Sequence, residues 1–92
     1  MTIRRQIIEV LKENSLSALD LSQLIGIKER EVYDHLNHIQ RTIASKPENF
    51  VMTPPRCLTC GYVFRQRSRL TKPSRCPRCK GTRLTRPTYR IE

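Results

Sequence analysis

The chain has 92 residues, of which 37% are hydrophobic, 28% charged and 5% aromatic, so it is long enough for one small domain or two subdomains that share a core. This length excludes a large enzyme scaffold. With 18 lysines and arginines against 8 acidic residues, the net charge of +10 is typical of proteins with a polyanionic partner, nucleic acid ahead of an anionic membrane.

Charge and structure-breaking residues divide the chain into two parts. Residues 1–46 carry 7 basic and 6 acidic side chains and no proline. Residues 47–92 carry 11 basic and 2 acidic side chains, all 6 prolines and all 4 cysteines. Because only the first part shows helical periodicity, we expect one domain over residues 1–46 and a second over residues 47–92.

Two helices are predicted in the first 26 residues. Apolar residues at helical spacing predict a helix over residues 2–12, whose apolar face is also a candidate homodimer interface. Ser17 and Asp20 form the pattern of a capping box at the start of a second helix, which Gly26 ends. Three apolar side chains of this second helix are expected to face inward: Leu21, Leu24 and Ile25.

A third helix is predicted over residues 29–44. Its apolar residues recur at spacings of four, three and four: Val32, Leu36, Ile39 and Ile43. With the preceding glycine turn, this gives the layout of a helix-turn-helix. The residues at the packing positions of this layout are Leu21, Ser22, Gly26, Ile27, Val32 and Leu36.

This pattern resembles that of the winged helix-turn-helix family, which implies that the third helix enters the major groove of DNA. A three-helix bundle used only for packing fits the same residues. On the face opposite the apolar stripe, Arg30 and Asn37 are suited to guanine and adenine, and Tyr33 and Arg41 to phosphates. Acidic residues outnumber arginines on this helix, so an ordinary solvated face remains an alternative.

The four cysteines predict a metal site. They fall in two C-x2-C pairs separated by fifteen residues: Cys57, Cys60, Cys76 and Cys79. This spacing predicts one structural zinc ion bound by four thiolates; it resembles zinc ribbons and, in its paired turns, rubredoxin. Thiolates also bind iron, but a basic segment with few aromatics favours zinc. Gly61 and Gly81 are expected to supply the positive φ angles of the two turns.

Arginines alternate between the cysteine pairs. Residues 62–69 are interpreted as a strand that leads into a hairpin, with Arg65, Arg67 and Arg69 on one face about 6.6–6.8 Å apart. This spacing is comparable to that of phosphates along a nucleic-acid strand, although an arginine-rich solvated surface would look the same. Residues 50–52 and 88–91 predict two further strands, antiparallel neighbours that tie this region to the helices.

The whole chain is similar to small prokaryotic proteins described as predicted transcriptional regulators, in which a winged helix-turn-helix is fused to a rubredoxin-like zinc ribbon. The resemblance implies an α+β fold: a three-helix winged helix-turn-helix-like domain and a C-terminal four-cysteine zinc ribbon of short antiparallel strands in the wing position. It implies regulation through double-stranded DNA. Two other interpretations stay open: an RNA- or ribosome-associated zinc-ribbon protein, and a protein-interaction adaptor of the transcription machinery.

Catalysis and membrane insertion are not expected. The sequence shows no nucleophile with a base and an orienting acid, no glycine-rich phosphate loop and no placed pair of carboxylates, so we predict no catalytic residues. No apolar run approaches the ~18 residues of a membrane span. Paired thiols without a disulfide framework suit a reducing compartment, and we therefore expect a cytoplasmic protein.

Overall fold

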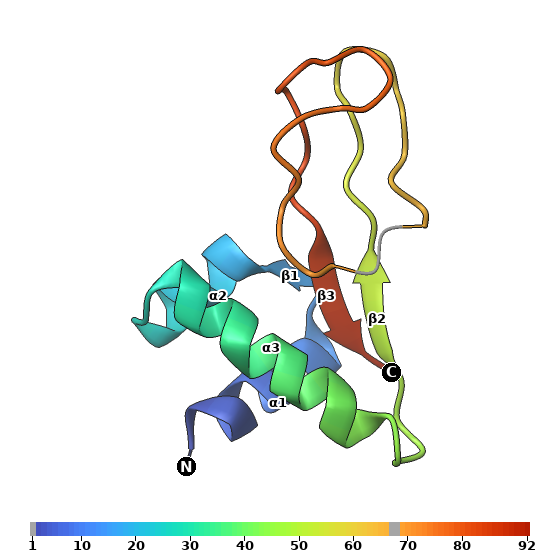
Figure 1. The fold of residues 1–92 in the computed structure, drawn as a ribbon. Helices are drawn as coiled ribbons and strands as arrows, with labels where there is room; N and C mark the ends of the chain where they lie inside the picture. Colours follow the sequence, from blue (N-terminus) through green and yellow to red (C-terminus); the bar gives the residue numbers. More distant parts are fainter. Residues whose placement is uncertain (1, 67–68) are drawn as a thin grey trace.

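The computed structural model describes residues 2–66 and 69–92. In this part of the chain, three helices pack on a three-stranded antiparallel sheet, and the cysteine-bearing segment (residues 54–66 and 69–87) extends from one end of that sheet (Figure 1). The expected mixture of helices and a small antiparallel sheet is confirmed. The elements in chain order are α1 (Ile3–Glu13), β1 (Leu16–Ser17), α2 (Ala18–Ile25), α3 (Glu29–Ile43), β2 (Phe50–Thr53) and β3 (Thr88–Ile91).

Local capping determines where the first two helices begin and end. The hydroxyl of Thr2 caps α1 by accepting a hydrogen bond from the N–H of Arg5. The predicted capping box of α2 is confirmed: Ser17 Oγ accepts from the N–H of Asp20, and the Asp20 carboxylate accepts from the N–H of Ser17. Gly26 ends α2 in the left-handed conformation with φ of 84°.

The helices share one apolar core with the sheet. The predicted stripe of α3 is buried, and it packs with residues from α1, α2 and β3; this core includes Ile7, Leu11, Leu21, Val32, Leu36, Ile39, Ile43, Tyr89 and Ile91. The prediction that Leu24 faces inward is wrong, because its side chain is 60% exposed. At about 100° per residue, Leu24 is rotated away from the core-facing line of Leu21 and Ile25.

The sheet pairs a strand between the first two helices with the two strands that flank the cysteine-bearing segment. Its strand order is β1-β3-β2, so the last strand of the chain is the central one. The predicted antiparallel pairing of residues 50–52 with 88–91 is confirmed, with Met52 opposite Tyr89. The sequence did not predict β1, because two residues are too few to show an alternating pattern. On its other edge β3 pairs with β1, where Leu16 also lies opposite Tyr89.

The described part of the cysteine-bearing segment contains isolated bridges in place of regular strands. Arg56 bridges to Val63, and Cys57 to Leu84. The predicted strand over residues 62–69 is wrong for its described part, residues 62–66 and 69: the N–H of Arg65 bonds to the carbonyl of Val63 at 2.9 Å, and the chain turns there. This i to i−2 hydrogen bond ends the extended alternation that the prediction required.

Candidate metal centre and nucleic-acid interface

Each cysteine pair closes a tight turn of the backbone, and the two turns are built alike. The N–H of Gly61 donates to the carbonyl of Cys57 at 3.0 Å, and the N–H of Lys80 donates to the carbonyl of Cys76 at 2.9 Å. Gly61 and Lys80 therefore hold equivalent positions. Both have positive φ, 80° and 65°, a conformation that glycine adopts at little cost and lysine does not.

The prediction of a positive φ at Gly81 is wrong, since Lys80 takes that conformation in the second turn. Glycine is needed at position 81 for a different reason. Its N–H lies 3.4 Å from Cys79 Sγ, and a Cβ atom built on Gly81 would come within 3.2 Å of the same sulfur. This close approach of the backbone to the Cys79 sulfur accounts for a glycine at position 81.

The four sulfur atoms lie within 4.8 Å of one another. The Sγ atoms of Cys57 and Cys79 are 3.6 Å apart, and those of Cys60 and Cys76 are 3.7 Å apart. Sulfurs at the corners of a tetrahedron with Zn–S bonds of about 2.3 Å are about 3.8 Å apart. The donor set and its spacing therefore fit one structural zinc ion, as predicted.

A small apolar cluster packs against the cysteines. Cys57 and Cys76 are 1% and 0% exposed, whereas Cys79 is exposed to solvent. Phe64 packs on the cysteines and meets the ring of Tyr62 edge to face, with centroids 5.0 Å apart. This cluster is separate from the helical core, so the metal must supply much of the folding free energy of this segment.

Backbone N–H groups set the ionisation of the thiols. A hydrogen bond from the N–H of Cys60 lowers the pKa of Cys57 to about 6. Burial opposes the charge of Cys76, but N–H groups of Cys79 and Arg78 lower its pKa. The N–H of Gly81 favours the Cys79 thiolate, whereas its contact with Cys57 and burial raise its pKa to about 11. A bound Zn²⁺ stabilises all four thiolates.

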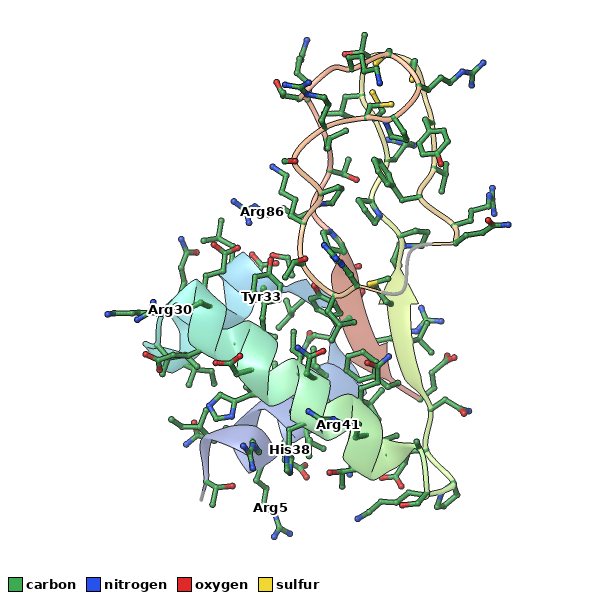
Figure 2. The ribbon with its side chains drawn as sticks, viewed as in Figure 1. Arg5, Arg30, Tyr33, His38, Arg41 and Arg86 are labelled. Carbon is green, nitrogen blue, oxygen red and sulfur yellow. The ribbon has the colours of Figure 1, made fainter. Side chains whose placement is uncertain are left out.

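Three of the predicted nucleic-acid residues lie together on α3. Arg30, Asn37 and Arg41 are exposed, and Arg41 Nε donates to the carbonyl of Asn37 at 3.4 Å. Figure 2 shows Arg30 near the start of α3 and Arg41 farther along the helix. The exposed Asp34 shares this face, so its charge is mixed.

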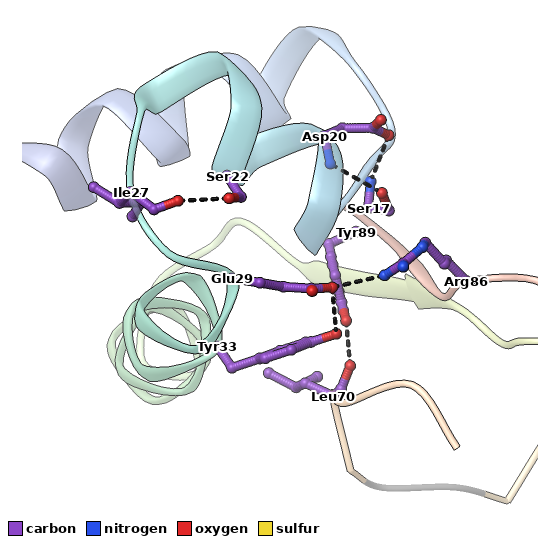
Figure 3. Close-up of polar contacts among 9 residues, drawn as sticks. All are labelled: Ser17, Asp20, Ser22, Ile27, Glu29, Tyr33, Leu70, Arg86 and Tyr89. Atoms are coloured by element: carbon purple, nitrogen blue, oxygen red, sulfur yellow. Dashed lines mark hydrogen bonds and ion pairs between the residues drawn. The ribbon is translucent and has the colours of Figure 1, made fainter. Parts of the chain in front are cut away.

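Tyr33 lies apart from these three residues. Its half-buried ring packs against the core, and its hydroxyl donates to Glu29 Oε1 at 3.5 Å (Figure 3). Burial first, then the charge of Glu29, raise the pKa of Tyr33. The structure therefore directs this side chain toward the cysteine-bearing segment, on the edge of α3 that Figure 2 places nearest Arg86.

Of the three arginines predicted to alternate along a strand, the two that the structure describes do not lie on one extended strand. Arg65 and Arg69 are both exposed, and the chain turns at residues 65–66. Arg67 lies outside the described residues. Both described arginines remain available to a phosphate backbone, but not at the regular spacing that a strand would give.

Sequence reasoning missed the contacts that dock the cysteine-bearing segment on the helices. Arg86 forms an ion pair with Glu29 of α3 at 2.6 Å, and the hydroxyl of Tyr89 donates to the carbonyl of Leu70 (Figure 3). Leu70 is 3% exposed and belongs to the helical core. The one available signal in the sequence was Leu70 itself, a large aliphatic residue in a basic stretch, which is typical of a buried position.

Two matched turns holding four thiolates at zinc distances define the cysteine-bearing segment as a zinc ribbon, here joined to a helical unit. The family model described as "PF0610 rubredoxin-like zinc beta-ribbon domain" matches residues 54–92, and the one described as "PF0610-like, N-terminal" matches residues 2–51. The chain therefore belongs to the PF0610-like family. From here on, the ribbon means the cysteine-bearing segment.

A solved relative has the same overall fold. The solution NMR structure of protein PF0610 from Pyrococcus furiosus is 28% identical to this chain, with a TM-score of 0.81. The match covers 98% of this chain and 88% of that one. No curated protein matches the sequence. Among the described residues, no helix combines the length and apolar character that crossing a bilayer requires.

Proposed function

We propose that this protein is a DNA-binding transcriptional regulator of winged helix-turn-helix type, in which the zinc ribbon replaces the wing. In this arrangement α3 enters the major groove, the ribbon contacts neighbouring phosphates and zinc holds the ribbon in shape. The protein performs no catalysis, and the reduced thiols of its metal site suit the cytoplasm.

The observation that carries this proposal is the topology. The described elements follow the order α1, β1, α2, α3, β2, β3, and the sheet has the order β1-β3-β2. In the winged helix-turn-helix family that the sequence resembles, the hairpin wing directly follows the third helix. Here the ribbon lies between β2 and β3, at the end of the sheet (Figure 1).

The turn between α2 and α3 supports the same proposal. Gly26 reverses the chain, and the hydroxyl of Ser22 donates to the carbonyl of Ile27, which fixes α3 against α2. A recognition helix must be held firmly, because its contacts to bases depend on its position, and α3 meets this requirement. Its exposed Arg30 and Asn37 have the chemistry for bidentate contacts to guanine and adenine.

The electrostatics of α3 favour modest base selectivity. The charge of Glu29 is paired with Arg86, which leaves Asp34 beside Arg30 and Arg41 on the exposed face. A carboxylate on this face accepts a hydrogen bond from cytosine but repels phosphates. Affinity therefore comes mainly from arginines flanking α3, and Arg65 and Arg69 of the ribbon are candidates.

A selection from random duplexes at about 150 mM salt tests the proposal. We expect enrichment of one short motif, with the oligomeric state of the complex measured by light scattering because a homodimer would give a repeated half-site. The Asn37→Ala variant should lose about 1–3 kcal/mol of binding free energy to the enriched site and relax its sequence. Asn49→Ala is the matched control, because it removes the same side chain at an exposed position outside α3.

Other outcomes would replace the proposal. Equal affinity for structured RNA and duplex DNA without enrichment would indicate an RNA- or ribosome-associated ribbon. A protein complex that survives high salt, with no duplex bound, would indicate an adaptor of the transcription machinery, because phosphate contacts weaken steeply as salt rises.

A further inference from the structure

A shallow groove of about 370 Å³ is lined by residues of α1, of α3 and of the segment that follows α3. Figure 1 shows α1 on the side of α3 away from the ribbon. Arg5 and Lys46 lie on its rim, and Ile39 and Ile43 contribute to its floor. A second hollow, over Asn37 and Arg41, lies next to it. Arg4 and His38 line both hollows, so the groove continues the exposed face of α3.

One lysine pairs with both acidic residues of the groove. Lys12 Nζ lies 3.8 Å from a carboxylate oxygen of Glu9 and 3.8 Å from one of Glu48. Arg4 is held by His35, since its Nε donates to His35 Nδ1 at 3.2 Å. Four cations, Arg4, Arg5, Lys12 and Lys46, line the groove against these two carboxylates, so its net charge is positive.

Two exposed cations of this rim have no acidic partner. In residues 2–66 and 69–92, neither Arg5 nor Lys46 forms an ion pair. Figure 2 shows Arg41, His38 and Arg5 following one another from α3 to α1, whereas Tyr33 and Arg86 lie toward the ribbon. The exposed face of α3 thus has the ribbon on one side and this cationic rim on the other.

Of the three isoleucines that line the groove, Ile8 is partly exposed and the other two are buried, so an apolar partner would find one partly exposed side chain there. Ile39 and Ile43 are only 1% and 4% exposed, so their side chains are already covered within the chain. An amphipathic peptide or a second copy of the chain would need apolar surface there. A polyanion needs only the charges of the rim, which favours a nucleic-acid backbone as the occupant.

A helix in the major groove has one phosphate strand on each side. We propose that Arg5 and Lys46 bind the phosphate backbone on the α1 side of α3, opposite the strand that the ribbon contacts. This inference rests on the proposed DNA-binding function and assigns that function a second backbone contact. It involves no base contact, so it adds affinity without sequence preference.

The test measures duplex binding by fluorescence anisotropy at several salt concentrations between about 50 and about 200 mM. The variants are Arg5→Ala with Lys46→Ala together, Arg41→Ala, and Arg90→Ala as a control of equal charge change per site. Each is measured on the selected duplex and on a random duplex of the same length. Two lost phosphate contacts should weaken binding to both duplexes about tenfold at low salt and reduce the salt slope by about 2.

The results separate this inference from the proposed function. If the double variant keeps the affinity and salt slope of the unmodified protein while Arg41→Ala weakens binding, the groove is not a backbone contact and the proposed function stands. If the unmodified protein binds no duplex, both are wrong. If a glutamate-rich peptide binds and the double variant loses that binding but not duplex binding, the groove serves a protein partner and the inference is overturned.

Loss of folding does not confound the comparison. Arg5 and Lys46 are exposed, so we expect the melting temperature of the double variant to match that of the unmodified protein. Arg5→Gln with Lys46→Gln removes the same two charges with longer side chains. It should show the same change in salt slope, and an unchanged slope would overturn the inference.

Discussion

The hydroxyl of Tyr89, in the central strand of the sheet, donates a hydrogen bond to the backbone carbonyl of Leu70 in the ribbon. Both residues are buried, at 0% and 3% exposed, and both belong to the core of the helical unit. The ribbon is thus part of the structure that stabilises the helices, although it contains its own metal site.

Leu70→Ala should destabilise the whole zinc-bound protein. Removing this buried side chain leaves a cavity between ribbon and helices, and we expect a loss of about 2–5 kcal/mol in the free energy of unfolding. Tyr89→Phe should cost about 1–3 kcal/mol, because the carbonyl of Leu70 loses its donor in a buried site. Urea unfolding followed by circular dichroism measures both.

Leu24→Ala is the matched control for Leu70→Ala, because the same side chain is shortened at a position that is 60% exposed. It should change stability by about 0.5 kcal/mol or less. Equal effects of the two substitutions would show that Leu70 does not contribute to the core in solution.

Zinc removal should lower the melting temperature of the helices as well as unfold the ribbon. Structural zinc contributes about 10–16 kcal/mol to the folding of small domains, so a chelator should remove the ribbon's structure. The helices then lose the cover that Leu70 provides, although most of their circular dichroism signal should persist at room temperature. Thermal melts with and without chelator measure this coupling.

A double comparison isolates the contact through Leu70. In the Leu70→Ala variant, chelator should lower the melting temperature of the helices less than in the unmodified protein, because the coupling side chain is already absent. Identical melts of the helices with and without zinc would show that the two parts fold independently.

Local patterns in the sequence predicted the helices and strands better than the contacts between the ribbon and the helices. The stripe of α3 and the capping box of Ser17 are set by spacings of three or four residues, and both are confirmed. The ion pair between Glu29 and Arg86 joins residues 57 positions apart, and no periodicity reports such a contact. The position of Tyr33 follows from that docking, so its burial could not be predicted.

The metal site was predictable for the same reason. Two short turns position all four cysteines, and the spacing within each pair is local. The strand over residues 62–69 failed because alternating arginines satisfy a strand pattern without supplying the apolar face that stabilises one. Phe64 and the next buried residue described after it, Leu70, enter two different clusters.

Lys80→Gly should tighten zinc binding. Lys80 has φ of 65° at the position that Gly61 holds in the first turn, and the left-handed conformation costs a residue with a Cβ atom about 1–2 kcal/mol. Because metal binding and folding are coupled in a small ribbon, this strain lowers zinc affinity. Glycine also adds flexibility to the unfolded chain, which offsets part of this relief, so competition with a chromogenic chelator should show about a twofold to fivefold gain in affinity.

Arg78→Gly is the control for that substitution, since it removes the same charge from an exposed position of the same turn without a positive φ. It should leave zinc affinity unchanged or lower it, because glycine adds flexibility to the unfolded chain. An equal gain in zinc affinity in both variants would show that the loss of a positive charge, and not the relief of backbone strain, causes the effect.

Acidification should release the zinc only below about pH 6. The N–H of Cys60 lowers the pKa of Cys57 from an ordinary value of 9.0 to about 6 in the folded ribbon. A group with a depressed pKa adds stability that is complete above its unfolded pKa and is lost as the pH falls through the folded one. The raised pKa of Cys79 acts in the opposite direction, but the bound ion lowers the pKa of all four thiolates, so we expect half-release below about pH 6.

A chelator that changes colour on binding zinc measures the released fraction after equilibration at each pH. The Gly81→Ala variant should shift half-release to a higher pH, because the added Cβ would lie 3.2 Å from Cys79 Sγ, a tight contact that crowds this ligand. Leu24→Ala, far from the site in the sequence and exposed on α2, should leave the midpoint unchanged. Half-release above pH 7 in the unmodified protein would contradict the stabilisation of the Cys57 thiolate by the backbone of its own turn.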